Sequence, residues 1–126
     1  MPTFQVEGAT RTFEAGSAIV KGRRVTFNTD GKVDHSTNVQ AGIGVALRAA
    51  AADGDPVPVR LWSAEVTWQV EASGVIGQGV ALEGAADGKF AAVGGAGVDL
   101  PLFNISVATA ADTDVFEAAK LLTGIV

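Results

Sequence analysis

Two segments of this chain are copies of one another, and this internal repeat constrains the fold more than any other feature. Residues 14–33 read EAGSAIVKGRRVTFNTDGKV and residues 71–90 read EASGVIGQGVALEGAADGKF, and they align without a gap at an offset of 57. The identical pairs are Glu14/Glu71, Ala15/Ala72, Ile19/Ile76, Gly22/Gly79, Asp30/Asp87, Gly31/Gly88 and Lys32/Lys89. The sequence therefore predicts that one supersecondary unit was duplicated.

A second, weaker block follows each copy. GVALRAAAADGD over 44–55 corresponds to NISVATAADTD over 104–114 after a one-residue deletion, and both blocks end in an Asp-x-Asp turn. Two copies are too few for a solenoid. We therefore expect a single all-β domain, a small sandwich or barrel of two tandem modules over 13–61 and 62–126, with an extended N-terminal arm over 1–12.

Apolar residues recur mostly with a period of two, which predicts strands. Ala64, Val66, Trp68 and Val70 alternate with polar residues and predict one half-buried strand. Residues 57–61 predict another, placed at a sheet edge or carrying a bulge because Pro58 has no N–H to donate. Further short strands are expected at 25–27 and around Ile105 and Val107.

Glycine punctuates these runs, and both Asp-Gly-Lys sequences are expected to form hairpin turns of type I′. The segment 114–117 is open to two interpretations. Asp114-Val-Phe-Glu117 has the pattern of a capping box that begins a helix, whereas the repeat predicts a strand equivalent to Val57–Leu61. We favour the strand.

Composition excludes several classes of function. The chain has no Cys, so disulfides, thiolate chemistry and Cys-based zinc sites are excluded. Its net charge of −5 and its scattered Lys and Arg argue against nucleic acid as a partner. No apolar run approaches the roughly 20 residues of a membrane span. No signal peptide is expected, because no basic region precedes an apolar stretch.

Three loops carry residues that could bind a phosphate or a metal ion, but none has the full pattern that such a site requires. GAADGK over 84–89 is one residue short of a phosphate-binding loop and has Phe90 where a hydroxyl would bind magnesium. Asp53/Asp55 and Asp112/Asp114 offer carboxylates, but calcium needs about six oxygen ligands. We expect solvated turns, no metal and no cofactor, with joint use of Asp30, Asp53 and Asp55 left open.

No enzymatic activity is expected either. His35 is the only histidine, and it lies in DHSTN, which reads as a polar loop. Asp34, His35 and Ser36 are adjacent on an extended chain, so their side chains point apart and do not form a triad.

Two tryptophans, Trp62 and Trp68, lie just after the expected boundary between the modules. Trp68 shares the apolar face of its strand and is expected in the core. Trp62 lies on the side of Arg60 and Pro58, which leaves two interpretations: partial burial under a loop, or a contact with another subunit.

With this pattern assembled, the sequence resembles the head decoration, or capsid cement, proteins of tailed bacteriophages. The matching parts are the apolar arm at 3–6, GSAIVKGRRV at 16–25, GIGVAL at 42–47, AADGD at 51–55 and the Val-x-Val-x-Leu strand. The second module adds VEASG and AADGK.

The resemblance implies a structural protein that binds the outside of a phage head and bridges major capsid protein subunits. It would be made in the host cytoplasm and reside on the virion exterior, as a homotrimer or a dimer. Several modest contacts made at once would give avidity.

We expect the contact residues outside the repeat, where an extended arm could add to the sheet edge of a neighbouring subunit. These are Pro2, Thr3, Phe4, Gln5, Val6 and Glu7 in the arm, followed by Arg60 and Trp62 at the module junction. An ordinary first strand remains the alternative for the arm. For the whole chain, the alternatives are a tail-tube or head-fibre subunit, or a small carbohydrate-binding module.

Overall fold

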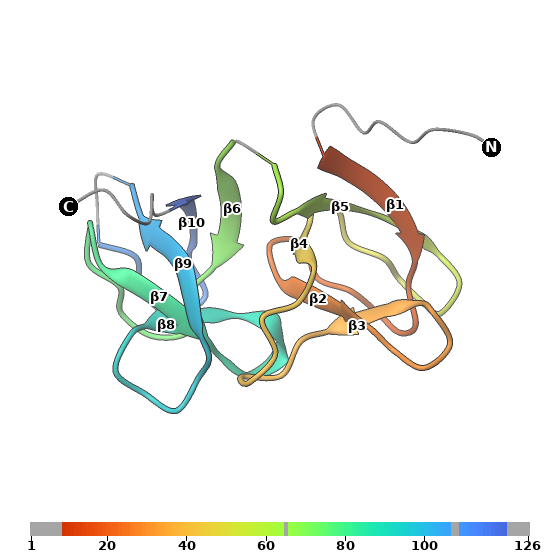
Figure 1. The fold of residues 1–126 in the computed structure, drawn as a ribbon, viewed down its shortest axis with the longest axis horizontal. Coiled ribbons are helices and arrows are strands. Elements are labelled where there is room, and N and C mark those ends of the chain that lie inside the picture. Colours follow the sequence, from red (N-terminus) through yellow and green to blue (C-terminus); the bar gives the residue numbers. More distant parts are fainter. Residues whose placement is uncertain (1–8, 65, 107–108, 121–126) are drawn as a thin grey trace.

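The computed structural model describes residues 9–64, 66–106 and 109–120. They form ten strands in two five-stranded antiparallel sheets that lie side by side (Figure 1). The first sheet contains β1 (Thr10–Glu14), β2 (Arg24–Phe27), β3 (Val33–His35), β4 (Gly44–Ala46) and β5 (Pro56–Leu61). The second contains β6 (Trp68–Glu71), β7 (Ala81–Gly84), β8 (Phe90–Ala92), β9 (Asp99–Asn104) and β10 (Val115–Lys120). The predicted all-β fold is confirmed.

The two sheets have the same topology. The strand order is β1-β5-β4-β2-β3 in the first and β6-β10-β9-β7-β8 in the second. A parallel bridge joins the two edges of each sheet, between Ala15 and Val33 in the first and between Ala72 and Phe90 in the second. Each sheet is thereby curled towards a barrel, and the repeat in the sequence corresponds to a repeat in the structure.

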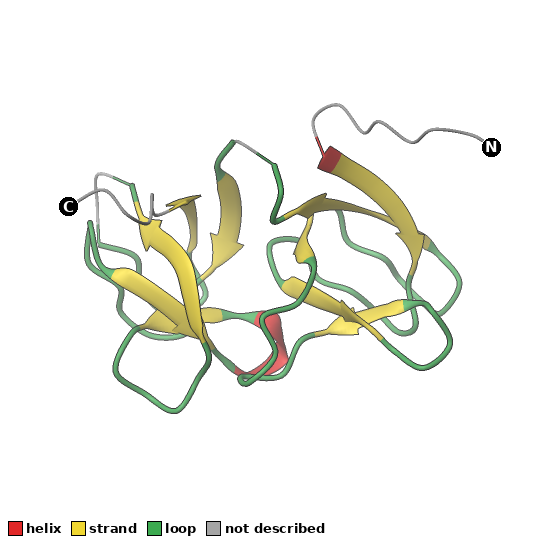
Figure 2. Ribbon diagram, in the orientation of Figure 1, coloured by secondary structure: helices red, strands yellow, loops and turns green. Residues whose placement is uncertain are grey.

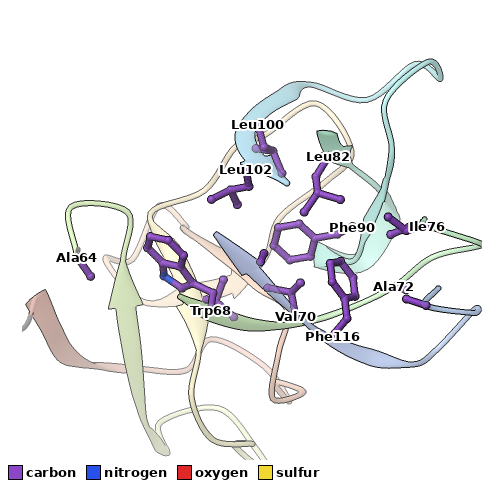
Figure 3. Close-up of a cluster of buried hydrophobic side chains, with 13 residues drawn as sticks. Ala64, Trp68, Val70, Ala72, Ile76, Leu82, Phe90, Leu100, Leu102 and Phe116 are labelled. Atoms are coloured by element: carbon purple, nitrogen blue, oxygen red, sulfur yellow. The ribbon is translucent and has the colours of Figure 1, made fainter. Parts of the chain in front are cut away.

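Each module has its own hydrophobic core. The first contains Ala15, Ile19, Val25, Val33, Ala46, Ala50, Val57 and Val59. The second is larger and aromatic, with Trp68, Phe90 and Phe116 at its centre (Figure 3). Val45 of β4 packs into the second core and its neighbour Ala46 into the first, because successive side chains of a strand point to opposite faces. Strand β4 therefore lies between the cores.

The structure corrects the expectation that Pro58 marks a sheet edge. Strand β5 lies between β1 and β4. The Pro58 carbonyl accepts a hydrogen bond from the Leu47 N–H at 2.8 Å, so the proline nitrogen faces the same side. Strand β4 has already ended at Ala46. The missing N–H therefore falls just beyond the end of the β4–β5 ladder, whose last pair is Ala46 and Val59.

Two predicted strands are shifted. The strand expected over 64–70 begins only at Trp68, because a turn in which the Ala64 N–H bonds the Leu61 carbonyl at 3.0 Å precedes it. Val66 is consequently 49% exposed. The strand expected around Ile105 is instead β9, which ends at Asn104, and Val107 lies outside the described residues.

Segment 115–120 is the strand β10, as the repeat predicts, and not a helix. The alignment of the second block is correct at its turn, where Asp55 and Asp114 accept equivalent bonds from the N–H groups of Ala52 and Ala111. At the strand the alignment is wrong by two residues, because it pairs Asn104 with Gly44. The Gly22 N–H bonds the Ala46 carbonyl and the Gly79 N–H bonds that of Asn104, so the equivalent of Asn104 is Ala46.

The two Asp-Gly-Lys turns are not identical. In the second copy Asp87 has φ 57° and Gly88 has φ 76°, which is the predicted type I′ geometry. The first copy is different, because only Gly31 has a positive φ there. The side chain of Asn28 accepts the N–H groups of Asp30 (2.9 Å) and Lys32 (3.1 Å) and holds another turn. Its equivalent Ala85 has no such group.

Regular helix is confined to single turns in the described residues. The η2 turn (Ala86–Gly88) lies at the junction between the sheets, as Figure 2 shows. Within the described part of the chain, no helix is long and apolar enough to cross a membrane.

Candidate functional site

The residues predicted to form the arm and the contacts fall into three locations. Pro2 to Glu7 lie outside the described residues. Thr10 to Thr12, which we assigned to the arm, lie in β1, where they pair with Arg60, Val59 and Pro58 of β5. Arg60 lies in β5, and Trp62 follows it directly at the junction of the two modules.

Arg60 lines a groove between the modules. This cavity of about 270 Å³ is bounded by Lys21, Ala46, Leu47, Arg60, Thr67, Gln69 and Glu117. The Arg60 Nη1 donates to the Thr67 carbonyl at 2.8 Å. The Thr67 hydroxyl in turn donates to the Glu117 carboxylate. The groove is therefore polar, and Arg60 is held within it.

Trp62 is half-buried. Its Nε1 donates to the carbonyls of Gly42 (2.9 Å) and Ala41 (3.2 Å). Its ring packs edge-on against Trp68, with 5.5 Å between the centroids, and against Phe90 at 6.5 Å. Trp68 is fully buried, as predicted. The junction tryptophans thus link the end of the first module to the core of the second.

Arg24 is the most unusual residue at this junction, because its side chain is completely buried and has no carboxylate partner among the residues that the structure describes. It donates to the carbonyls of Thr37 and Gln40 in the first module, and of Ala85 (2.7 Å) and Lys89 (3.1 Å) in the second. Its guanidinium carbon lies 5.4 Å from the centroid of the Phe90 ring. Burial lowers the pKa of Arg24 to about 10, so the group is still charged at neutral pH.

An ion-pair cluster lies beside it. Arg23 Nε donates to the Glu71 carboxylate at 3.0 Å, and Lys89 Nζ lies 3.5 Å from the same carboxylate. Burial alone would raise the pKa of Glu71, but hydrogen bonding and charge from Arg23, followed by the charge of Lys89, outweigh it and lower the pKa. The backbone adds bonds from Glu71 N–H to the Gly22 carbonyl (2.9 Å) and from Gly88 N–H to the Ser36 carbonyl (2.8 Å).

The sequence analysis missed this junction, although the repeat contains a signal for it. Arg23 and Arg24 align with Val80 and Ala81, so the only adjacent basic pair in the chain has no counterpart in the second copy. At this pair the two copies have different surroundings, since Arg23 and Arg24 contact the second module.

The residues considered for catalysis are engaged elsewhere. His35 is the last residue of β3, not part of a loop as we expected, and its Nε2 accepts the Val20 N–H at 3.0 Å. Burial lowers the pKa of His35, and the nearby charge of Arg23 adds to this effect. Asp34 bonds Ser17 and Asn28, so the hydrogen bonds of Asp34 and His35 run to different partners.

The acidic turns do not converge. Asp53 forms an ion pair with Lys32 at 2.8 Å, and Asp55 accepts backbone N–H groups within its own turn. Among the residues that the structure describes, no three His, Asp or Glu side chains are placed to hold a metal ion.

Comparison with known proteins finds similarity to a protein family and to solved structures. A family model described as phage cement protein matches residues 2–61. The solved structure of "head fiber gp8.5 N base in bacteriophage phi29" matches with a TM-score of 0.66 and 20% identity, over 90% of this chain and 97% of that chain. No curated protein matches. The resemblance to phage head decoration proteins is therefore confirmed, and the comparisons support a structural protein associated with a phage head.

Proposed function

Because residues 2–61 of this chain match the phage cement protein family, we propose that it binds the outside of a phage head and bridges major capsid protein subunits. The match itself carries this proposal. It ends at Leu61, the residue at which β5 and the first module end, and it includes the segment ahead of β1. The part of the chain that is similar to cement proteins is thus one complete structural unit with its preceding segment.

The contact that we propose first is made by Pro2 to Glu7. These residues lead into β1, an edge strand with four of its five residues exposed. An extended segment that adds to the sheet edge of a capsid subunit gains main-chain hydrogen bonds without demanding an exact side-chain fit.

Arg60 and Trp62 are the second part of the proposed contact. The groove that Arg60 lines opens between the modules, and its cationic groups, Lys21 and Arg60, suit a carboxylate side chain of the shell. Trp62 packs against Trp68 within the junction, so its contribution would be to fix the end of β5, the strand from which Arg60 reaches the groove.

We also propose that the protein acts as a homotrimer. Several copies held together engage several capsid subunits at once, and release then requires that all contacts break together. The added contacts would oppose the pressure of the packaged genome in addition to the contacts of the shell itself.

The test is co-sedimentation with expanded heads that lack the protein. A chain without residues 2–7 should bind at least tenfold more weakly than the full chain. A second variant, in which a Gly-Ser sequence of equal length replaces residues 2–7, separates the side chains from the mere length of the segment. Undiminished binding by the deleted chain would refute the role of the arm.

The fold match favours one further candidate, the base of a head fibre, since the matched structure is described as such a base. Electron microscopy of heads saturated with the protein separates the two functions. A cement protein adds compact density to the shell, whereas a fibre base requires a fibre projecting from it.

A further inference from the structure

The junction between the modules uses two different faces. We call face A residues 22–24 and 36–40 of the first module, with their second-module equivalents 79–81 and 93–97. We call face B residues 71 and 84–89 of the second module, with their first-module equivalents 14 and 27–32. Within the chain, face A of the first module covers face B of the second through the contacts of Arg23 and Arg24.

The repeat leaves most of one face of each kind uncovered in the described part of the chain. The exception is the end of face A in the second module, where Gly97 packs against the Gly84 backbone and the Val98 N–H donates to the Asn38 carbonyl at 2.9 Å. Face B of the first module contains Phe27, which is 48% exposed and packs edge-on against Phe13 with 5.2 Å between the ring centroids. Face A of the second module contains Val93, which is 44% exposed. Both free faces therefore present large apolar side chains to solvent.

The large and small side chains lie on opposite faces in the covered pair and in the free pair. At the covered junction Gly84 makes room for Arg24, because a Cβ on Gly84 would lie 2.7 Å from the Asn38 carbonyl oxygen and 3.0 Å from Arg24 Nη2. The offset of 57 continues past residue 90, because the Ser36 N–H bonds the Arg24 carbonyl and the Val93 N–H bonds that of Ala81, both at 3.0 Å. Gly84 therefore corresponds to Phe27, Arg24 to Ala81 and Asn38 to Gly95. In the free pair, the large residue therefore lies on face B and the small residues lie on face A.

The free faces also carry the donor and the acceptor for a backbone hydrogen bond like one at the covered junction. The Glu71 N–H donates to the Gly22 carbonyl at 2.9 Å across the covered junction. The corresponding groups are the Glu14 N–H and the Gly79 carbonyl. The Ala15 N–H bonds Asp55 of the neighbouring segment, and alternation along an antiparallel pair directs the Glu14 N–H away from β5.

We propose that these two free faces bind each other between two copies of the chain, in a head-to-tail arrangement. Phe27 of one copy packs over Ala81 and Gly95 of the second copy, and Glu14 N–H donates to Gly79 of the second copy. Because each copy has one free face of each kind, the contact is heterologous and generates a closed ring or an open chain.

Face A of the second module is uncharged, whereas face B of the first module carries Glu14, Asp30 and Lys32 beside Phe27. Val80 stands where Arg23 forms its ion pair with Glu71, so the intermolecular interface has no equivalent of that pair. Association should consequently depend little on salt concentration, since screening acts on charges and not on apolar burial.

Sedimentation equilibrium of the full chain tests the interface with Phe27→Arg, Ala81→Glu and the double variant. Each single variant should weaken self-association at least tenfold, and the double variant should restore it, because Arg and Glu then face each other. Val75→Arg is the matched control, since Val75 is 71% exposed and lies on neither face. A monomeric wild-type chain, or Phe27→Arg that associates as the wild type does, would overturn the proposal.

Disulfide trapping keeps the test independent of how Ala81→Glu folds, since the chain has no Cys. An oxidised mixture of Phe27→Cys and Ala81→Cys chains should give a covalent dimer, and a mixture of Val75→Cys and Ala81→Cys chains should not. Equal cross-linking in both mixtures would refute the interface. If Phe27→Arg abolishes head binding but leaves self-association intact, face B binds the capsid and the proposal is wrong, whereas the proposed function stands.

Discussion

The Nη2 atom of Arg24 donates a hydrogen bond to the carbonyl of Ala85, 61 residues further along the chain, at 2.7 Å. This bond joins β2 of the first module to the β7–β8 hairpin of the second. Four carbonyls from both modules converge on the same guanidinium. Arg24 therefore makes two similar modules into one unit.

Replacing Arg24 by Met should destabilise the protein by at least about 3 kcal/mol, because it removes the charged donor that four carbonyls of both modules share in part-buried bonds. Urea unfolding at pH 7 measures the loss. Arg48→Met is the control, since Arg48 is exposed and should tolerate the same change within about 0.5 kcal/mol. Equal stability of the two variants would contradict the role of Arg24.

The equivalent glycines Gly31 and Gly88 provide a matched pair of alanine substitutions. Both have φ 76°, so each Gly→Ala change carries the left-handed penalty of about 1–2 kcal/mol. A Cβ on Gly31 meets nothing within 4 Å, but one on Gly88 would lie 2.5 Å from the Arg24 carbonyl oxygen. Gly88→Ala should therefore cost clearly more free energy of unfolding than Gly31→Ala, and equal costs would argue against a tight junction.

Acid should weaken the junction through Glu71. Its pKa is lowered in the folded protein, so its contribution to stability is present above the unfolded value of 4.5 and is lost as the pH falls through the folded value. The difference in unfolding free energy between wild type and Glu71→Gln, measured by urea from pH 7 to pH 3, should shrink below pH 4.5. A constant difference would show that the charge of Glu71 contributes nothing.

His35 titrates in a separate window and can be followed alone, because it is the only histidine. Burial lowers its pKa below 6.5, so the folded protein resists protonation and stability declines as the pH falls from about 6.5 through the folded value. An NMR titration of the imidazole should give a midpoint below 6.5. A midpoint at or above 6.5 would contradict the bond that its Nε2 accepts from Val20.

Much of the fold could be predicted from the sequence because duplication and turn chemistry are local signals. The repeat anticipated equivalent strands, and it correctly favoured a strand for 115–120 over a helix. Pro58 shows where local reasoning stops. Whether its missing N–H matters depends on where the neighbouring strand β4 ends, which lies outside its own pattern.

The junction between the modules was less predictable, because its contacts join residues that lie far apart in the sequence. Arg24 contacts carbonyls up to 65 residues away, and nothing near it in the sequence specifies that distance. Trp62 was recognised as a junction residue, but its bonds to Ala41 and Gly42 depend on how the first module folds back on itself. The proposed contacts of Pro2 to Glu7 stay a prediction.

Binding of the whole chain to purified, expanded phage heads tests the central claim most directly. We expect saturable co-sedimentation at a fixed ratio to the major capsid protein, and saturated heads should withstand heat or chelator treatment that opens bare heads. Heads that neither bind the protein above background nor gain resistance would contradict the account.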